Sequence, residues 1–200
     1  QSSEPPGGGI ITGLGDVSSE SATLTLSAQV VNDDRMPRSF RMRNILLDAA
    51  GLEVASSLSE LTDLEPGQST CLMTRIMVMQ PALWTPETPF LYTIRTELLS
   101  ENGSVTDSRE TRTGIRTVRF TNDKGLLLNG QPVRLAGTNR HQEYPYIGCA
   151  LSDNASYRDA LKIKEAGFNI VRSSHYPPSP AFLYACDELG LMVIDAIPGW

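Results

Sequence analysis

The sequence predicts two folded parts in series, an immunoglobulin-like β-sandwich followed by a parallel β/α part. Residues 10–117 carry short segments that alternate apolar and polar side chains, with turn residues between them and no helical period. From residue 118 on, strand and helix patterns alternate through short loops, as in right-handed βαβ units. With 200 residues and 40% hydrophobic content, the chain can bury one or two cores. We expect a linker at 1–9, the sandwich at 10–117 and the β/α part at 118–200.

The sandwich is predicted from strands that have one apolar face. In 21–32 the apolar side chains fall on every second residue, which is typical of a half-buried antiparallel strand. Asn102-Gly103 supplies the positive φ angles of a tight hairpin turn. About seven strands without a helical period favour an immunoglobulin-like sandwich. The further strands are expected at 39–48, 68–79, 90–100 and 104–118.

Prolines are excluded from the interior of a sheet, so we expect an extended crossing segment rather than a strand where Pro81, Pro86 and Pro89 occur close together.

Methionines that share strand positions are expected to fill the core of the sandwich. They are Met73, Met77 and Met79.

The β/α part begins with a hairpin at 125–137, which turns at Asn129-Gly130. A helix over 155–166 follows, capped by Ser152 or Asp153 and stopped by Gly167. A continuous apolar strand at 168–172 is then expected, since both of its faces would be covered. A second helix begins after Ser179 with Pro180 at its first position and ends at Gly190, and a third apolar strand covers 191–196.

Polar and aromatic residues collect just after each of these parallel strands, at 138–144, 172–177 and 195–200. Binding groups of parallel β/α folds gather at the carboxyl ends of the strands. The only two histidines, His141 and His175, both occur there, each close to an arginine. Neutral hydrogen-bonding groups and aromatic faces suit a sugar. The other residues in these loops are Arg140, Arg172, Tyr144, Tyr146, Tyr176 and Trp200.

Other classes of function are disfavoured. A net charge of −6 without a basic cluster argues against nucleic acid and anionic membranes as partners. No run approaches the roughly 18 apolar residues that a membrane helix needs. Three distant cysteines without a CxxC pattern give no metal site, and we expect no cofactor and no disulfide framework. The helix carboxylates are expected on solvated faces: Asp159, Glu165, Asp187 and Glu188.

Three motifs then carry a family resemblance. "NRH" at 139–141, "VRSSHYP" at 171–177 and "CDELGLMVID" at 186–195 occur in order. Together they resemble the start of the catalytic barrel in glycoside hydrolase family 2, which includes β-galactosidases, β-glucuronidases and β-mannosidases. The segment 83–98, "LWTPETPFLYTIRTEL", resembles the end of the immunoglobulin-like domain of that family. The resemblance implies that 118–200 forms the first ~3 βα units of an incomplete TIM (β/α)8 barrel.

The resemblance also implies a retaining exo-glycosidase that acts on terminal β-linked sugars, β-galactosides before β-glucuronides or β-mannosides. Two glutamates, an acid/base and a nucleophile, would come from later barrel strands. We therefore expect the 200-residue chain to lack both and to be inactive. The rival interpretation is a non-catalytic carbohydrate-binding or scaffolding module. The compartment stays open, with a periplasmic or secreted bacterial protein favoured over a cytoplasmic one.

Site roles follow from the same resemblance. His141 and His175 would hydrogen-bond sugar hydroxyls, and Arg172 would lie under the nucleophile and keep it ionised. Asn139 and Arg140 would shape the edge, and Asp195 would orient neighbouring groups. Two positions depart from many members of the family, which have Glu where this chain has Gln142 and Ala196. These departures leave a metal site and the identity of the sugar open. An open barrel edge also predicts self-association or partial disorder of the barrel part.

Overall fold

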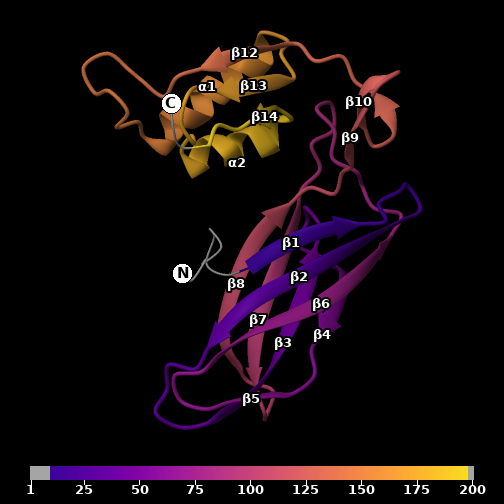
Figure 1. Cartoon of the computed structure of the whole chain (residues 1–200), viewed down its shortest axis with the longest axis vertical. Helices are drawn as coiled ribbons and strands as arrows, with labels where there is room; N and C mark the ends of the chain where they lie inside the picture. The colour runs from indigo at the N-terminus through magenta and orange to yellow at the C-terminus, as the bar shows by residue number, and fades with distance from the viewer. Residues whose placement is uncertain (1–9, 198–200) are drawn as a thin grey trace. The chain divides into compact units, whose positions relative to one another are not determined.

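The computed structural model describes residues 10–197 and divides the chain into two compact units, which are described separately (Figure 1). Unit 1 contains residues up to Ala82 together with Leu91–Ile115, and unit 2 contains Leu83–Phe90 together with the residues from Arg116 on. The linker expected at 1–9 and Trp200 lie outside the described residues. The domain boundary expected between 117 and 118 stays a prediction.

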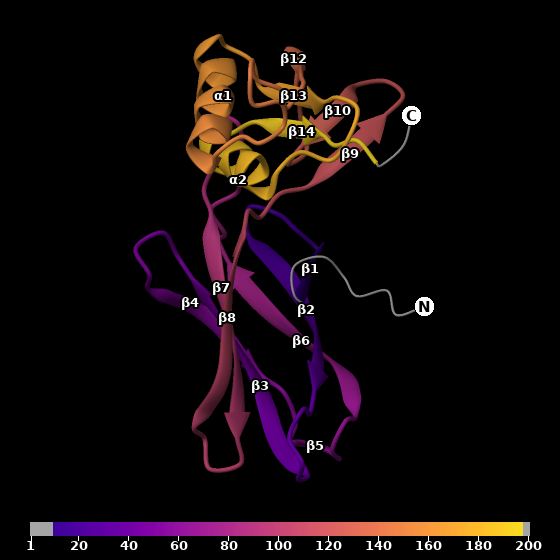
Figure 2. The same cartoon turned by 90° about the vertical axis from the view of Figure 1, so that its left-hand side faces the viewer.

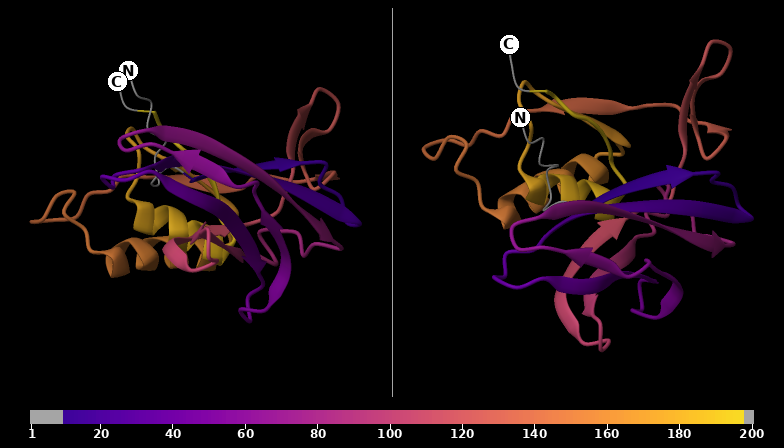
Figure 3. Two further views of the ribbon diagram at one scale, coloured as in Figure 1. Left: turned by 90° about the horizontal axis from the view of Figure 1, so that it is seen from below. Right: turned by 60° about the horizontal axis from the view of Figure 1, so that its bottom comes forward.

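Unit 1 is an antiparallel β-sandwich, which confirms the predicted fold class. In its described part, one sheet has the strand order β1-β2-β6 and the other has the order β4-β3-β7-β8, with β5 paired to β3. The two layers can be followed from below in Figure 3. The strands are β1 (Ile10–Gly15), β2 (Ser21–Val31), β3 (Arg38–Leu47), β4 (Glu53–Leu58), β5 (Thr62–Leu64), β6 (Ser69–Met79), β7 (Tyr92–Ser100) and β8 (Val105–Thr113).

The core of unit 1 follows from the alternation that the sequence shows. Every second residue of β2 is buried, and the same holds for much of β3 and β7. The core also contains buried polar side chains. The Asn44 side chain is fully buried, donates to Thr74 Oγ1 (2.8 Å) and accepts from Thr96 Oγ1 (2.6 Å). Since Thr74 belongs to β6 and the other two residues belong to the opposite sheet, these bonds join the two layers.

The three methionines of β6 do not fill the core, and this expectation was wrong. Met73, Met77 and Met79 are 62 to 67% exposed. The alternate residues of the same strand, Ile76 and Val78, are buried. Because β6 is apolar on both faces along this stretch, the sequence pattern alone did not decide which face turns inward.

From Arg116 on, unit 2 has a small antiparallel sheet followed by parallel strands and helices. The parallel β/α part is as predicted. The parallel sheet has the order β12-β13-β14, and both helices lie on the same side of it (Figure 2). The antiparallel sheet of unit 2 consists of β9 (Val118–Thr121), β10 (Gly125–Leu128) and β11 (Gln131–Pro132). The parallel part consists of β12 (Gly137–Arg140), α1 (Asp153–Glu165), β13 (Ile170–Ser173), α2 (Pro180–Leu189) and β14 (Met192–Ile194).

Both helices start and stop where their capping residues predict. The Ser152 side chain accepts from the backbone N–H of Ala155, and the Ser179 side chain accepts from that of Phe182. A buried cluster then joins α1, α2 and the sheet, and it contains Ala160, Val171, Phe182, Ala185, Cys186 and Leu191.

Among the described residues, neither helix has the length and apolar content needed to span a membrane.

Leu83–Phe90, which precedes β7 in the chain, packs within unit 2. Trp84 is 1% exposed, and its indole N–H donates to the carbonyl oxygen of Asp187 in α2 (2.9 Å). The Arg116 guanidinium lies 4.5 Å from the centre of the same ring. Lys164 in α1 donates to the carbonyl oxygen of Pro86 (2.6 Å). This segment therefore holds both helices from the side of their carboxyl-terminal residues.

Candidate functional site

The three parallel strands bring the predicted site residues to one edge of the sheet. Their register places Asn139 beside Arg172, and Arg172 beside Ile194. The chain leaves each strand one or two residues later, so His141, His175 and Asp195 follow neighbouring strand ends. This is the edge at which parallel β/α folds hold their ligands.

The two histidines meet at this edge. The ring centres of His141 and His175 lie 5.3 Å apart, and their planes are inclined by 74°. The Tyr176 ring lies 6.4 Å from that of His141, and its hydroxyl oxygen accepts from the backbone N–H of Gln142 (3.0 Å). Burial raises the pKa of the Tyr176 hydroxyl, so Tyr176 stays protonated and keeps a donor. The loops after β12 and β13 thus bring aromatic rings and polar atoms together at the strand ends.

A hollow of about 300 Å³ opens at the ends of β13 and β14. Arg172, His175 and Asp195 line it. Two serines fix two of these side chains: Arg172 Nη1 donates to Ser174 Oγ (2.9 Å), and Ser173 Oγ donates to Asp195 Oδ1 (3.1 Å). The hollow therefore presents a cation, an imidazole and a carboxylate, and serine hydroxyl groups hold the cation and the carboxylate in position.

Arg172 also faces a second hollow, of about 320 Å³, on the sheet face away from the helices. Asn139 lines this hollow together with Ile170 and Ile194. These side chains share a face because residues two apart on a strand, or in register on neighbouring strands, point the same way. Asn139 and Arg172 are thus gathered on the face that a closed barrel would turn inward.

Arg140 lies on the opposite face, toward the helices. Its side chain is 6% exposed, and its guanidinium lies 4.0 Å from the centre of the Phe182 ring. Arg140 Nε donates to Asp159 Oδ2 on α1 (3.0 Å). Asp159 therefore does not lie on a solvated face as expected, since its side chain is 17% exposed and holds a buried cation. Arg140 thus packs between α1 and α2.

The two positions that depart from the resemblance both take part in local hydrogen bonds. Gln142 Oε1 accepts from the backbone N–H of Ser179 (2.8 Å), which ties the loop after β12 to the start of α2. The backbone N–H of Ala196 donates to Ser173 Oγ (3.0 Å). Within residues 10–197, no group of three or more His, Cys, Asp or Glu side chains could hold a metal ion.

Sequence reasoning missed Ser173, Ser174 and Asp159. The serines could have been found from their place between Arg172 and His175. Asp159 could have been found from the helix period, because Ser156, Ala160 and Ile163 share its face of α1 at helical spacing. A carboxylate on the buried stripe of a helix needs a donor, and Arg140 is that donor.

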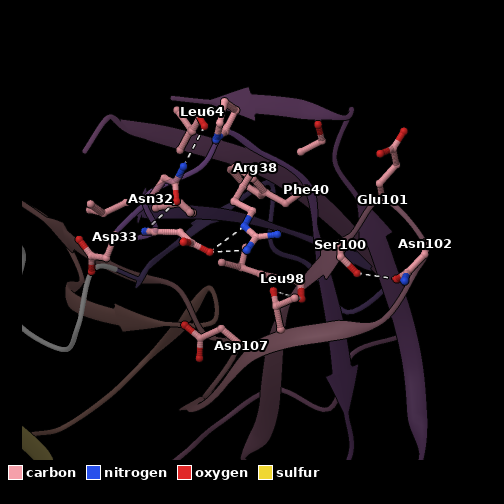
Figure 4. A pocket seen from close by; sticks show the side chains of 16 residues that line it. Asn32, Asp33, Arg38, Phe40, Leu64, Leu98, Ser100, Glu101, Asn102 and Asp107 are labelled. Atoms are coloured by element: carbon pink, nitrogen blue, oxygen red, sulfur yellow. Dashed lines mark hydrogen bonds and ion pairs between the residues drawn. The ribbon is translucent and has the colours of Figure 1, made fainter. Parts of the chain in front are cut away.

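Another hollow lies elsewhere, at one end of the sandwich in unit 1 (Figure 4). It measures about 870 Å³ and runs between the β2–β3 loop and the β7–β8 hairpin. Val30, Phe40 and Leu64 form its apolar floor. Asp34 accepts from Arg38 at its rim, which lowers the pKa of the Asp34 carboxyl. None of the predicted site residues lines this groove, and its volume alone assigns it no chemistry.

Comparisons with known proteins find similar proteins for both parts of the chain. The family model described as glycosyl hydrolases family 2 matches residues 12–116, and the model of its TIM barrel domain matches residues 118–199. A β-galactosidase of Thermoanaerobacter pseudethanolicus is 41% identical over 157 residues, which are 78% of this chain and 21% of that protein. A β-galactosidase of Bacteroides ovatus is 33% identical over 189 residues, which are 94% of this chain and 22% of that protein.

A solved structure is similar over nearly the whole chain as well. A crystal structure of a Bacteroides uniformis β-glucuronidase has a TM-score of 0.89 and 35% sequence identity, and the match covers 95% of this chain and 23% of that one. The chain thus spans about a fifth of the length of the relatives that it matches.

Proposed function

Since the chain belongs to glycosyl hydrolases family 2, we propose that it is part of a retaining exo-glycosidase that removes terminal β-linked sugars. β-Galactosides are the proposed substrates and β-glucuronides are the first alternative, followed by β-mannosides. The names of the relatives support the first two substrate classes, because β-galactosidases and a β-glucuronidase are similar to this chain.

The observation that carries the proposal is the meeting of His141 and His175 at the carboxyl ends of two parallel strands. Imidazole nitrogens can donate to sugar hydroxyls or accept from them, and we propose that both histidines bind hydroxyls of the terminal sugar. The Tyr176 ring next to them offers an apolar face for sugar C–H groups.

Arg172 has a different proposed role. It lines both hollows at the strand ends, so its guanidinium can reach a group bound in either of them. We propose that it lies under the nucleophile and keeps that carboxylate ionised. Asn139 would share this face, Asp195 would orient neighbouring groups, and Arg140 would act through its packing.

The chemistry needs two further carboxyl groups about 5–5.5 Å apart, one as acid/base and one as nucleophile, with a covalent glycosyl-enzyme between the two steps. We propose that both are glutamates of barrel strands outside these 200 residues. The 200-residue chain would then supply part of the sugar subsite, and it would not turn over a substrate by itself.

A panel of nitrophenyl β-glycosides tests the proposal. A protein of the relatives' full length that carries this chain is expected to cleave the β-galactoside fastest, whereas the purified 200-residue chain cleaves none. Fastest cleavage of the glucuronide or mannoside would replace the substrate. Turnover by the 200-residue chain would refute the placement of the catalytic pair.

One observation favours a second candidate, a non-catalytic carbohydrate-binding module. The groove of unit 1 combines an apolar floor with amide and carboxylate groups at its rim, among them Asn102 and Asp107. Calorimetric titration of residues 10–117 with neutral oligosaccharides tests it. Saturable binding that is lost in Phe40→Ala, while the protein stays folded, would favour this candidate, and its absence would remove it.

Self-association is a separate proposal about the isolated chain. Among the described residues, β12 and β14 are the outer strands of the parallel sheet, and Ile194 on β14 is 51% exposed. We propose that unpaired strand edges and apolar faces here lead the 200-residue chain to associate. Sedimentation velocity over a range of concentrations is expected to show dimers or larger species, and a monomer at every concentration would contradict this.

A further inference from the structure

We propose that Asp159 is a positioning residue, which holds His141 and the end of β12 in place for sugar binding; this inference rests on the proposed function. Asp159 lies on α1 and does not face either hollow at the strand ends. It would act through the two side chains that it binds, without touching substrate.

Both oxygens of the Asp159 carboxylate are used. Oδ2 accepts from Arg140 Nε at 3.0 Å, and Oδ1 accepts from the Tyr144 hydroxyl. Arg140 Nη2 also lies 3.0 Å from Oδ2, but it is too poorly aligned to donate a hydrogen bond. The attraction between Arg140 and Asp159 is therefore carried by one hydrogen bond and by charge.

The partners flank His141 in the chain. Arg140 is the last residue of β12 and immediately precedes His141, and Tyr144 follows three residues later. One carboxylate thus fixes the chain on both sides of the histidine. A rigid anchor of this kind is needed because His141 itself is exposed.

Arg140 is also linked through the backbone to the residue before the second histidine. The carbonyl oxygen of Arg140 accepts from the backbone N–H of Ser174 (3.0 Å), and Ser174 immediately precedes His175. A shift of Arg140 would therefore move both sides of the 5.3 Å contact between the histidine rings. Small displacements of binding groups are costly in catalysis, about 10²-fold for a misplacement of about 1 Å.

Charge makes Asp159 hard to replace. The Arg140 side chain is 94% buried against Phe182, and a buried cation that loses its carboxylate is left uncompensated. Asp159→Asn keeps the size and the acceptor but removes the charge, whereas Asp159→Glu keeps the charge. Glu165→Gln is the matched control, since it removes an exposed carboxylate from the same helix.

The first measurement is steady-state kinetics of a full-length protein that carries this chain. Asp159→Asn is expected to lower kcat/KM by about 10²-fold, mostly in kcat, because the histidines bind the sugar more tightly in the transition state. Asp159→Glu should restore part of the loss, and Glu165→Gln should match the wild type. Tyr144→Phe, which removes the hydrogen bonds of the Tyr144 hydroxyl to Asp159 and from Arg158, should lower kcat/KM roughly 5-fold.

The second measurement does not depend on activity. The 200-residue chain contains two histidines, so labelling histidine with ¹⁵N gives nuclear magnetic resonance signals from His141 and His175 alone. Asp159→Asn is expected to shift the His141 signals and to disturb those of His175, while Glu165→Gln leaves both unchanged. If Asp159→Asn unfolds unit 2, Tyr144→Phe carries the test, because it keeps the ion pair.

The outcomes separate the two proposals. A wild-type protein that cleaves no β-glycoside would refute the proposed function, and the histidine signals would still decide the role of Asp159. An active wild type with unchanged kcat/KM in Asp159→Asn would overturn the positioning role. A loss of activity with unmoved histidine signals would overturn it too, since the effect would then not pass through His141.

Discussion

Gly190 ends α2 in contact with the backbone of Pro86, and there is no room between them for a side chain. Its φ angle is 74°, and a Cβ atom on Gly190 would lie 2.2 Å from the carbonyl oxygen of Pro86. The end of the helix and the segment Leu83–Phe90 are therefore packed as closely as their backbones permit.

Gly190→Ala is predicted to destabilise unit 2 strongly. The positive φ costs about 1–2 kcal/mol for alanine, and the clash adds about 1–3 kcal/mol. Gly167→Ala is the matched control, since Gly167 also has a positive φ (86°) but has no atom within 4 Å of its Cβ position. Urea denaturation followed by tryptophan fluorescence, to which the buried Trp84 contributes, measures both. Equal losses in the two variants would contradict the close contact with Pro86.

The buried amide of Asn44 gives a prediction for unit 1. Asn44→Ala is expected to lower the free energy of unfolding by about 1–3 kcal/mol, because Thr96 Oγ1 loses its acceptor inside the core. Gln29→Ala removes an exposed amide from β2 and should change stability by less than about 0.5 kcal/mol. Far-UV circular dichroism during urea denaturation reports the sheets. A stability of Asn44→Ala equal to that of Gln29→Ala would show that the bridge between the sheets contributes nothing.

The three cysteines are predicted to differ in reactivity. Cys71 and Cys149 are exposed, whereas burial raises the pKa of the Cys186 thiol to about 12. A thiol-specific reagent at about pH 8 should therefore modify two thiols in the native chain and the third only after unfolding. Rapid reaction of all three thiols in the native state would contradict the burial of Cys186.

The same thiol predicts how stability depends on pH. The folded-state pKa lies above the ordinary value of 9.0, so the unfolded chain loses this proton first as the pH rises. The free energy of unfolding should fall between pH 9.0 and about 12, by at most about 1.4 kcal/mol per pH unit from this group. The slope should be smaller in Cys186→Ala. Identical slopes would exclude a contribution from Cys186.

Much of the fold could be predicted because local sequence patterns, such as strand alternation and helix caps, match the way in which the elements pack. The alternation of β2, the caps Ser152 and Ser179 and the stop at Gly190 all lie where the pattern placed them. The methionines of β6 could not be placed, since a strand that is apolar on both faces has no preferred inward face in its sequence. The packing of Trp84 within unit 2 depends on contacts across about a hundred residues, which no local pattern contains.

The candidate site was predictable at the level of the strand ends, but not of the individual side chains. His141 and His175 could be placed together because both follow parallel strands. Asn139 and Arg140 were assigned to one edge, yet adjacent residues of a strand point to opposite faces, so Arg140 turns toward α1. That alternation, combined with the helical spacing of Asp159, would have predicted their ion pair.

The effect of His175→Ala on the cleavage of a β-glycoside by a full-length protein that carries this chain tests the proposed sugar subsite most directly. We predict that kcat/KM falls by about 10²-fold or more, a loss of about 3 kcal/mol of transition-state binding. Tyr184→Ala, which truncates an exposed ring on α2, should leave kcat/KM unchanged. If His175→Ala cleaves the substrate as fast as the wild type, the strand ends around His175 do not form the sugar subsite.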